Sequence, residues 1–370
     1  MDEITIRAKR YSRIKYALFF IHICFSLIFL AAVLYLKLHI QLRDFSYYCA
    51  GENLYLALGI FLVIFAGLYA IAFLPFDFYA GFMLEHRFNL SNQTLRSWCV
   101  RYMKQHLVSA VIFFPLAEVF YFFLKNYPSS WWIFISLIWI FFSIILAKFT
   151  PMFIIPLFYK LTPLRDGQLK ERLRKFILIA RFMVKEICEI NLSKDTKKAN
   201  AAFTGMGKTK RILLSDTLLA NFTHDEVEVV LAHEIGHKKF GHIWQHLLFG
   251  SALTFLGMFI LRYVLTAYGR LFGFIGLYDI ANFPFILLYF SLFGLVFLPS
   301  QNAFSRHLER QADRYALVLT KNKPAFISAM EKLAQQNLAD KTPPLLIEIL
   351  LYDHPPISKR IQSARAVTQQ

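Results

Sequence analysis

The sequence predicts a mainly α-helical protein that crosses a membrane several times and carries a polar domain outside the bilayer. Apolar residues make up 57% of the 370 residues and charged residues 18%, whereas soluble domains average about 45–50% and about 25%. Six long apolar runs alternate with polar stretches. This balance excludes a disordered chain and argues against an ordinary soluble enzyme.

Each of the six runs has about the 20 residues that a helix needs to cross a bilayer. They cover residues 16–36, 53–76, 105–124, 126–147, 243–261 and 283–303. A further run at 149–161 is broken by Pro151 and Pro156 and is short for a span. We expect it to be an interfacial connector, which favours six spans and leaves a seventh as the alternative.

The distribution of basic residues predicts the orientation. With six spans, 36 of the 41 Lys and Arg residues lie on the side that holds both termini and the polar domain. Basic residues near membrane spans favour the cytoplasmic side. We therefore expect both termini and the polar domain in the cytoplasm. The net charge of +17 is then explained by membrane orientation, so no nucleic-acid partner is expected.

The runs divide the chain into four segments. Residues 1–147 hold four spans, 148–242 the first part of the polar domain, 243–303 two spans, and 304–370 the second part of that domain. Because two spans return the chain to the same side, the two polar parts can meet. In the first part, periodicity predicts an amphipathic helix over 167–185 and short strands at 187–192 and 211–215.

A helix is predicted over 222–240, with Thr223 as its N-cap. Glu226 follows three residues later and completes a capping box. A straight helix would place the later His242 and His246 on other faces than His233, at roughly 180° and 220°. We therefore expect His242 and His246 to be interfacial residues at the start of the fifth span.

This helix contains the pattern H-E-x-x-H, formed by His233, Glu234 and His237. At about 100° per residue, the two histidines lie roughly 40° apart and can bind one metal ion from one face. Glu234 flanks them, as suits a general base that acts on water. The pattern therefore predicts a metal-dependent hydrolase. The alternative is a surface helix with solvated or packed histidines.

Two histidines leave a catalytic zinc site incomplete, because such sites usually have three protein ligands. After the sixth span, Glu309 and Asp313 lie four residues apart on one helix face. Glu309 is the candidate third ligand, and Asp313 the candidate acceptor for a ligand histidine's N–H. Spacing alone equally allows a solvated acidic face, paired with Arg306, Arg310 and Arg314.

Together these residues resemble the type I CAAX prenyl proteases, a family of integral-membrane zinc endopeptidases. Four segments carry the resemblance, in the right order: Pro156–Leu164, Asn200–Gly205, Ser305–Asp313, and His354-Pro355-Pro356 with Arg360. The resemblance implies a helix bundle that encloses a water-filled chamber. It also implies a gluzincin-type zinc domain with a small β-sheet.

The resemblance further implies roles for individual residues. One Zn²⁺ would be held by His233, His237 and Glu309. Asn200 and Ala201 would lie on an edge strand that binds the substrate backbone by strand addition. The implied role of His354 and Arg360 is to stabilise the oxyanion.

The predicted function is zinc-dependent hydrolysis of peptide or protein substrates, including prenylated and membrane-associated ones. Two departures from the family stand out: Ala202 occupies a position that is often aromatic, and long insertions of the eukaryotic members are missing. The second departure favours a prokaryotic homologue, in a bacterial inner membrane rather than the endoplasmic reticulum. The alternatives are a quality-control metalloprotease of the heat-shock type, a six-span transporter with an incidental metal site, and an inactive binding scaffold.

Overall fold

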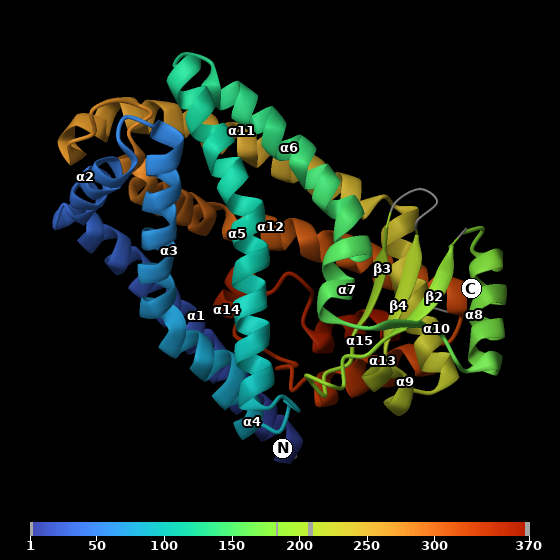
Figure 1. Ribbon diagram of the computed structural model, residues 1–370. Helices are drawn as coiled ribbons and strands as arrows, with labels where there is room; N and C mark the ends of the chain where they lie inside the picture. Colours follow the sequence, from blue (N-terminus) through green and yellow to red (C-terminus); the bar gives the residue numbers. More distant parts are fainter. Residues whose placement is uncertain (1–2, 183, 206–209, 367–370) are drawn as a thin grey trace.

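The computed structural model describes residues 3–182, 184–205 and 210–366, and it has two regions (Figure 1). Long helices form one region, and a small sheet with shorter helices forms the other. Helix α12 (Phe283–Thr320) runs from the first region into the second. One continuous helix thus extends from the membrane part into the polar domain.

Six helical segments of the described chain are long and apolar enough to cross a membrane, as predicted. The segments are Glu3–Tyr35, Leu54–Arg87, Leu95–Asn126, Trp131–Phe158, His242–Phe272 and Ile280–Thr320. The corresponding main helices are α1 (Glu3–Tyr35), α3 (Leu54–Phe78), α5 (Leu95–Asn126), α6 (Trp131–Phe149), α11 (His242–Tyr268) and α12.

Two connections are more helical than expected. The run at 149–161 continues α6 through a π-helical turn, Thr150–Ile154, into α7 (Ile155–Phe158). It is thus largely an extension of the fourth span. Residues 37–52, which connect the first two predicted spans, contain α2 (Leu38–Ala50). Lys37 before α2 has a φ of 56°, a left-handed conformation that separates α2 from α1.

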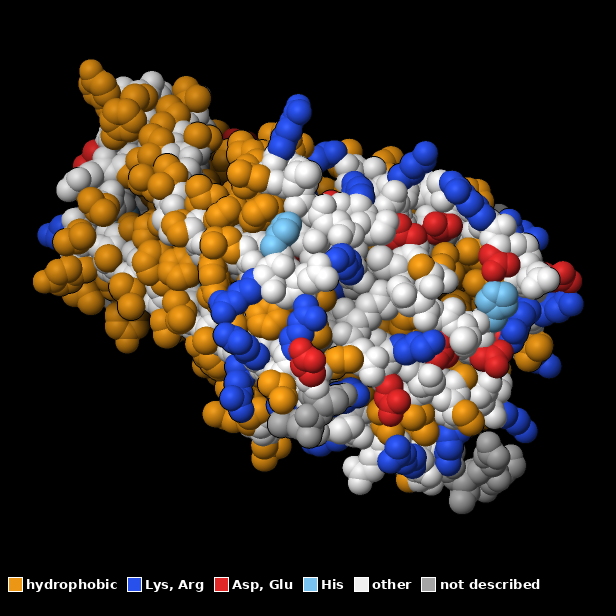
Figure 2. All heavy atoms as spheres, turned by 90° about the horizontal axis from the view of Figure 1, so that it is seen from below, with side chains coloured by type: hydrophobic (Ala, Val, Ile, Leu, Met, Phe, Trp, Pro, Cys, Tyr) orange, Lys and Arg blue, Asp and Glu red, His pale blue; other side chains and the backbone are white. Residues whose placement is uncertain are grey.

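Aromatic side chains are buried where the long helices pack against one another. Phe61, Tyr121 and Trp131 are at most 1% exposed, and the Tyr121 hydroxyl donates a hydrogen bond to Asn282 Oδ1. Figure 2 shows the opposite pattern on the surface: apolar side chains cover the helical region, and charged ones gather over the polar domain. The apolar surface of the long helices is what a lipid environment requires.

The polar domain contains a four-stranded sheet in the order β1-β2-β4-β3. Its strands are β1 (Leu161–Pro163), β2 (Glu186–Ile190), β3 (Ala201–Thr204) and β4 (Arg211–Ser215). β2 and β4 are parallel, and the other two pairs are antiparallel. The strands predicted at 187–192 and 211–215 are β2 and β4. β3 lies at an edge of the sheet.

Shorter helices accompany this sheet. They are α8 (Gly167–Ile179), α9 (Asp216–Asn221), α10 (His224–Lys239), α13 (Lys323–Gln336), α14 (Leu345–Leu351) and α15 (Ile357–Ala366). The helix predicted over 167–185 is α8, which is shorter because Arg181 adopts a φ of 55°; residue 183 of that range lies outside the described residues. Leu173, Ile212 and Leu231 are completely buried where α8, the sheet and α10 meet.

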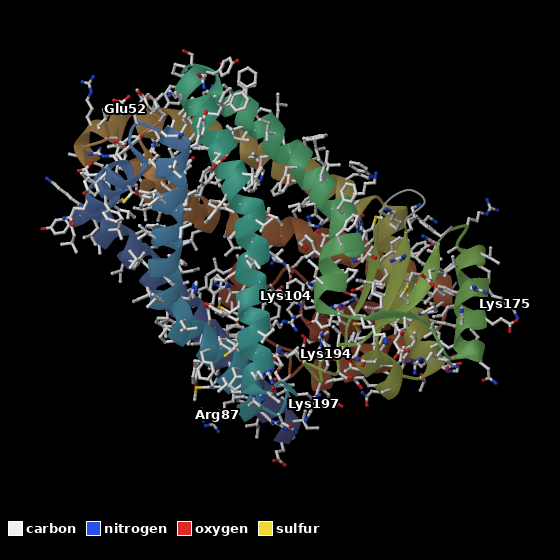
Figure 3. The ribbon with its side chains drawn as sticks, in the orientation of Figure 1. Glu52, Arg87, Lys104, Lys175, Lys194 and Lys197 are labelled. Carbon is white, nitrogen blue, oxygen red and sulfur yellow. The ribbon has the colours of Figure 1, made fainter. Side chains whose placement is uncertain are left out.

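Polar contacts join the membrane helices to the domain. On α5, Arg101 donates to Asp195 and to the Tyr159 hydroxyl. Lys104 and Lys194 donate to backbone carbonyls at the end of α7, and Figure 3 places both beside that junction. The second polar part, after α12, packs against the first through α10, α13 and α15. The four-segment division of the chain stays a prediction.

Candidate metal centre

Helix α10 begins where the sequence predicts. The Thr223 side chain accepts a hydrogen bond from the Glu226 backbone N–H, and the Glu226 side chain accepts one from the Thr223 N–H. Ser328 and Lys332 on α13 also donate to Glu226. The start of α10 is therefore held both by its capping box and by hydrogen bonds from α13. This fixes the direction in which the histidines of α10 project.

The close approach of α10 to α12 depends on Gly236. A Cβ at this position would lie 3.0 Å from the backbone Cα of Ala312 and 3.3 Å from its carbonyl oxygen. Backbone atoms cannot rotate out of the way, so a larger residue would push the two helices apart. The glycine within H-E-x-x-H therefore brings His233 and His237 within reach of Glu309.

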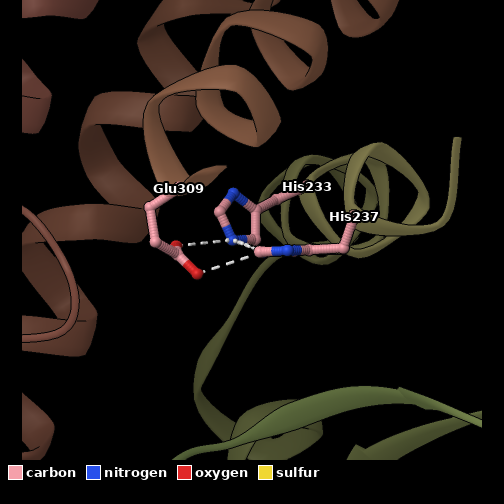
Figure 4. Close-up of side chains that lie close together, drawn as sticks. All are labelled: His233, His237 and Glu309. Atoms are coloured by element: carbon pink, nitrogen blue, oxygen red, sulfur yellow. Dashed lines mark hydrogen bonds and ion pairs between the residues drawn. The ribbon is translucent and has the colours of Figure 1, made fainter. Parts of the chain in front are cut away.

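Three side chains converge between α10 and α12 (Figure 4). The Nε2 atoms of His233 and His237 lie 3.1 Å apart. Each is 3.2 Å from a different oxygen of Glu309, Oε2 for His233 and Oε1 for His237. Two imidazoles and a carboxylate are a donor set typical of zinc.

The geometry of these donors fits a cation. One donor atom from each residue lies within 4.8 Å of the others. Glu309 Oε2 is buried and has no hydrogen-bond partner among the described residues, since its contact with His233 lacks hydrogen-bonding geometry. A buried, unpaired carboxylate oxygen is costly. A metal ion coordinated by these three residues would remove that cost.

Asp313 and Arg360 fix His233 from the other side. His233 Nδ1 lies 2.9 Å from Asp313 Oδ1, and Arg360 donates two hydrogen bonds to the same carboxylate, at 2.5 and 2.8 Å. All three residues are at most 8% exposed. Burial disfavours a charged imidazole, but Asp313 and Glu309 outweigh it and raise the pKa of His233 to about 9. The site therefore attracts positive charge.

His242 contacts the site, which the sequence analysis did not anticipate. The helix predicted over 222–240 ends as expected, but the chain does not continue straight: α10 ends at Lys239, Gly241 adopts a φ of 65°, and α11 begins at His242. The turn buries His242 to 1% exposure and brings its Nδ1 to 2.9 Å from His237 Nδ1. His242 is thus no interfacial residue. The one sequence signal for this turn is the glycine.

Glu234 lies between the histidines and the sheet edge. Its Oε2 accepts a hydrogen bond from the Phe203 backbone N–H in β3, at 3.1 Å. The carboxylate is therefore held beside the metal centre and next to the strand that the resemblance assigns to substrate. This is a suitable place for a base that must reach water and substrate together.

Two further predicted residues, His354 and Asn200, lie near the centre. His354 Nε2 is 3.2 Å from Glu309 Oε1, and its Nδ1 is 2.8 Å from Asp353, which the sequence analysis missed. Burial disfavours its charged form, yet Asp353 and Glu309 raise the pKa of His354. Asn200 precedes β3, and its backbone pairs with Ser215.

A cavity of about 740 Å³ opens beside these groups. His233, Glu234, His354 and Arg360 line it, together with the start of β3 and residues of α1, α12 and α13. Its walls also carry apolar side chains, namely Phe19, Leu298, Leu333, Leu350, Leu351 and Ile357. The arrangement can hold an extended peptide with apolar side chains next to the metal centre.

Comparison with known proteins agrees with this arrangement. Residues 163–368 match Peptidase family M48, and residues 2–160 match a domain described as CAAX prenyl protease N-terminal, five membrane helices. The chain belongs to peptidase family M48. It is an integral-membrane metallopeptidase that crosses the membrane several times, as the six helical segments require.

Relatives of this M48 peptidase occur in bacteria and eukaryotes. It is 29% identical to the uncharacterized metalloprotease YhfN of Bacillus subtilis, over 96% of this chain and 84% of that protein. Identity to CAAX prenyl protease 1 of Saccharomyces cerevisiae is 31%, over 84% and 72%. The crystal structure of S. mikatae Ste24p matches with a TM-score of 0.89 at 25% identity, over 98% of this chain and 90% of that one.

Proposed function

We propose that this M48 peptidase is a zinc-dependent endopeptidase that cleaves near the C-terminus of its substrates, as the name CAAX prenyl protease implies for its relatives. The observation that carries the proposal is the convergence of His233, His237 and Glu309 beside Glu234, at the wall of a large cavity. His233, His237 and Glu309 would hold one Zn²⁺. Zinc bound there supplies a Lewis acid that polarises a carbonyl and lowers the pKa of water.

Glu234 acts as the general base and acid. Its carboxylate takes a proton from the attacking water and returns that proton to the leaving amine. The hydrogen bond from Phe203 N–H holds Oε2, and Oε1, which accepts no hydrogen bond from the described residues, is available for the proton. This position ties proton transfer to the strand along which the substrate lies.

His354 and Arg360 provide positive charge next to the reacting carbonyl. His354 is half-exposed and lies against Glu309, so it can donate a hydrogen bond to the developing oxyanion. Arg360 lines the same cavity while its guanidinium holds Asp313. Asp313 in turn accepts the Nδ1 proton of His233, which directs the Nε2 lone pair of that ring toward the metal centre.

The substrate lies along the free edge of β3, where Asn200 and Ala201 contact its backbone. Strand addition tolerates many side chains, and the apolar cavity wall accepts the hydrophobic end of a CAAX sequence, with or without a prenyl group. The match of residues 2–160 to the CAAX prenyl protease N-terminal domain favours this substrate class over the misfolded proteins that a heat-shock-type protease would degrade.

The proposed orientation places the polar domain and both termini in the cytoplasm, as the basic residues indicate. A cytoplasmic site is consistent with substrates that are lipidated and membrane-associated. Figure 3 shows Glu52 and Arg87 at opposite ends of the segment that contains α3. Cysteine labelling from outside intact cells should therefore reach a variant at Glu52 but not one at Arg87.

The experiment that tests the function uses purified protein in detergent and synthetic peptides that end in a CAAX sequence. Farnesylated and unmodified forms are incubated with enzyme, and products are identified by mass spectrometry. We expect release of a short C-terminal peptide, loss of cleavage with a chelator, and recovery with zinc. Glu234→Gln should keep the metal and abolish cleavage. A Glu234→Gln preparation that still cleaves would overturn the mechanism.

A further inference from the structure

Lys15 is a positive charge in the cavity for which the proposed function has no use. Its exposed side chain, on α1, lines the same cavity as His233 and Glu234. Lys15 Nζ lies 5.6 Å from the centre of the Tyr11 ring. Among the described residues, no carboxylate lies within ion-pair distance of Lys15.

The neighbouring cation, Lys198, is already paired, and the neighbouring acid, Asp340, is held in a turn of its own. Lys198 Nζ lies 2.8 Å from Glu85 and also donates to the Tyr11 hydroxyl. Asp340, another cavity residue, is buried and accepts a hydrogen bond from the Thr342 N–H. Among the described residues that line this part of the cavity, Lys15 is therefore the cation without a carboxylate partner, and it can bind an anion.

Lys15 lies toward the beginning of β3. Ser12, one turn earlier on α1, donates to the Leu338 carbonyl, which fixes this part of α1 next to the residues that follow α13. Tyr11 contacts both Lys15 and Lys198, and Lys198 precedes Ala199 by one residue. α1 thus brings the charge close to one end of the substrate-binding edge.

The free edge of β3 is open at one end and closed at the other. Asn200 pairs with Ser215 toward the sheet, so alternation directs the backbone groups of Ala201 and Phe203 away from it. The Phe203 N–H already donates to Glu234, which leaves the Ala201 groups and the Phe203 carbonyl for a substrate. At Ala199 the edge is occupied: Asn337 accepts from the Ala199 N–H at 2.9 Å and donates to its carbonyl at 3.2 Å. A substrate strand cannot pair beyond Asn337.

This closure determines how a substrate can lie. A chain end fits at the closed end, whereas a continuing polypeptide must leave at the open end. In the proposed function, the chain end next to the cleavage site is the C-terminus. A substrate with its C-terminus at the closed end runs antiparallel to β3. Its C-terminal carboxylate then lies close to Lys15.

We propose that Lys15 binds the free C-terminal carboxylate of the substrate, so that the enzyme recognises a chain end and not an internal sequence. The inference rests on the proposed function. A charge-assisted hydrogen bond between an ammonium group and a carboxylate is among the stronger polar contacts. Asn337 contributes by stopping the backbone so that its terminus lies beside Lys15.

The test measures binding of fluorescent CAAX peptides that end in either a free carboxylate or a carboxamide. Binding is measured in the zinc-loaded Glu234→Gln background, in which no cleavage is expected. We expect the acid to bind about 10- to 100-fold more tightly than the amide. Lys15→Met should remove this difference by weakening only the acid, and Lys15→Arg should keep it. Arg13→Met is the matched control, since it removes a basic residue of α1 that does not line the cavity.

Equal binding of acid and amide by the parent protein would overturn the inference, as would a preference that persists in Lys15→Met. Size-exclusion profiles check that each variant is folded. Hydrolysis by the enzyme with Glu234 intact separates this inference from the proposed function. Zinc-dependent cleavage of acid and amide at equal rates refutes only the role of Lys15, whereas no cleavage of any peptide refutes the peptidase function as well.

Discussion

The two histidines of the metal centre are held in different ways. His233 contacts the carboxylate of Asp313, which Arg360 neutralises, and all three residues are buried. His237, whose side chain is 26% exposed, contacts the neutral ring of His242. The His233 side is therefore charged and dry, whereas the His237 side is neutral and reaches solvent.

The neutral side forms a chain of hydrogen bonds with one consistent direction. If His237 coordinates through Nε2, its Nδ1–H donates to His242 Nδ1, and His242 Nε2–H donates to Gln311 Oε1, at 2.9 and 3.2 Å. Gln311 then donates to the exposed His307 at 2.9 Å. Hydrogen bonds to charged groups are stronger than those between neutral groups. The His233 side should therefore tolerate substitution less well.

Replacing Glu309 should have the largest effect, because its two oxygens contact both histidines. We expect Glu309→Ala to weaken zinc binding by more than the roughly 100-fold that loss of a ligand's hydrogen-bond partner causes. Elemental analysis of purified protein measures the metal content. Glu234→Gln is the matched control, because it alters a neighbouring carboxylate that contacts Phe203 instead. Full metal content in Glu309→Ala would show that the two sides do not share an ion.

Asp313→Ala should have the next largest effect, on both metal affinity and stability. It leaves the buried guanidinium of Arg360 without its carboxylate, which typically costs about 3–5 kcal/mol of folding free energy. It also removes the acceptor for His233 Nδ1, which should weaken zinc binding about 10- to 100-fold. Thermal unfolding in detergent and chelator competition measure the two effects.

The double variant Asp313→Ala/Arg360→Met separates these effects. Removing the unpaired charge should restore part of the stability but not the metal affinity, because His233 still lacks its acceptor. If Asp313→Ala unfolds at the same temperature as the parent protein, the described contrast between the charged and neutral sides is wrong.

The parts of the site that could be predicted from sequence are those set by local rules. The capping box at Thr223 and the spacing of His233 and His237 fix one helix face, whatever surrounds it. Glu309 followed from spacing only as one of two alternatives, and the family resemblance was needed to choose between them. Long-range contacts such as Arg360 with Asp313 depend on how α15 packs, which no local pattern encodes.

Other features escaped prediction for identifiable physical reasons. His242 was missed because a single left-handed residue, Gly241, changes the direction of the chain and so changes which face is shared. β3 has four half-buried residues, too few for a periodic signal, so it was expected only by resemblance. α2 lies in a short segment of mixed polarity between two spans, where a loop and a helix have similar sequence patterns.

His242→Ala tests the neutral side directly. Without its acceptor, His237 loses the hydrogen bond that orients its ring, and zinc binding should weaken about tenfold, the low end of the range for such partners. His246→Ala is the matched control: His246 lies one turn further along α11, with its ring against Phe304. An effect of His242→Ala as large as that of Asp313→Ala would mean that charge does not distinguish the two sides.

The smallest effect is expected from Gln311→Ala, one step further along the neutral chain. Within the described part of the chain, the side chain of Gln311 is hydrogen-bonded to His242 and His307 and to none of the three metal-binding residues. Its loss removes one neutral hydrogen bond to His242, so zinc affinity should change by no more than about threefold. Chelator competition in parallel with His242→Ala measures the change. If zinc affinity falls as much as in His242→Ala, Gln311 fixes the tautomer of His242. The hydrogen-bonded residues His242 and Gln311 would then orient His237 together.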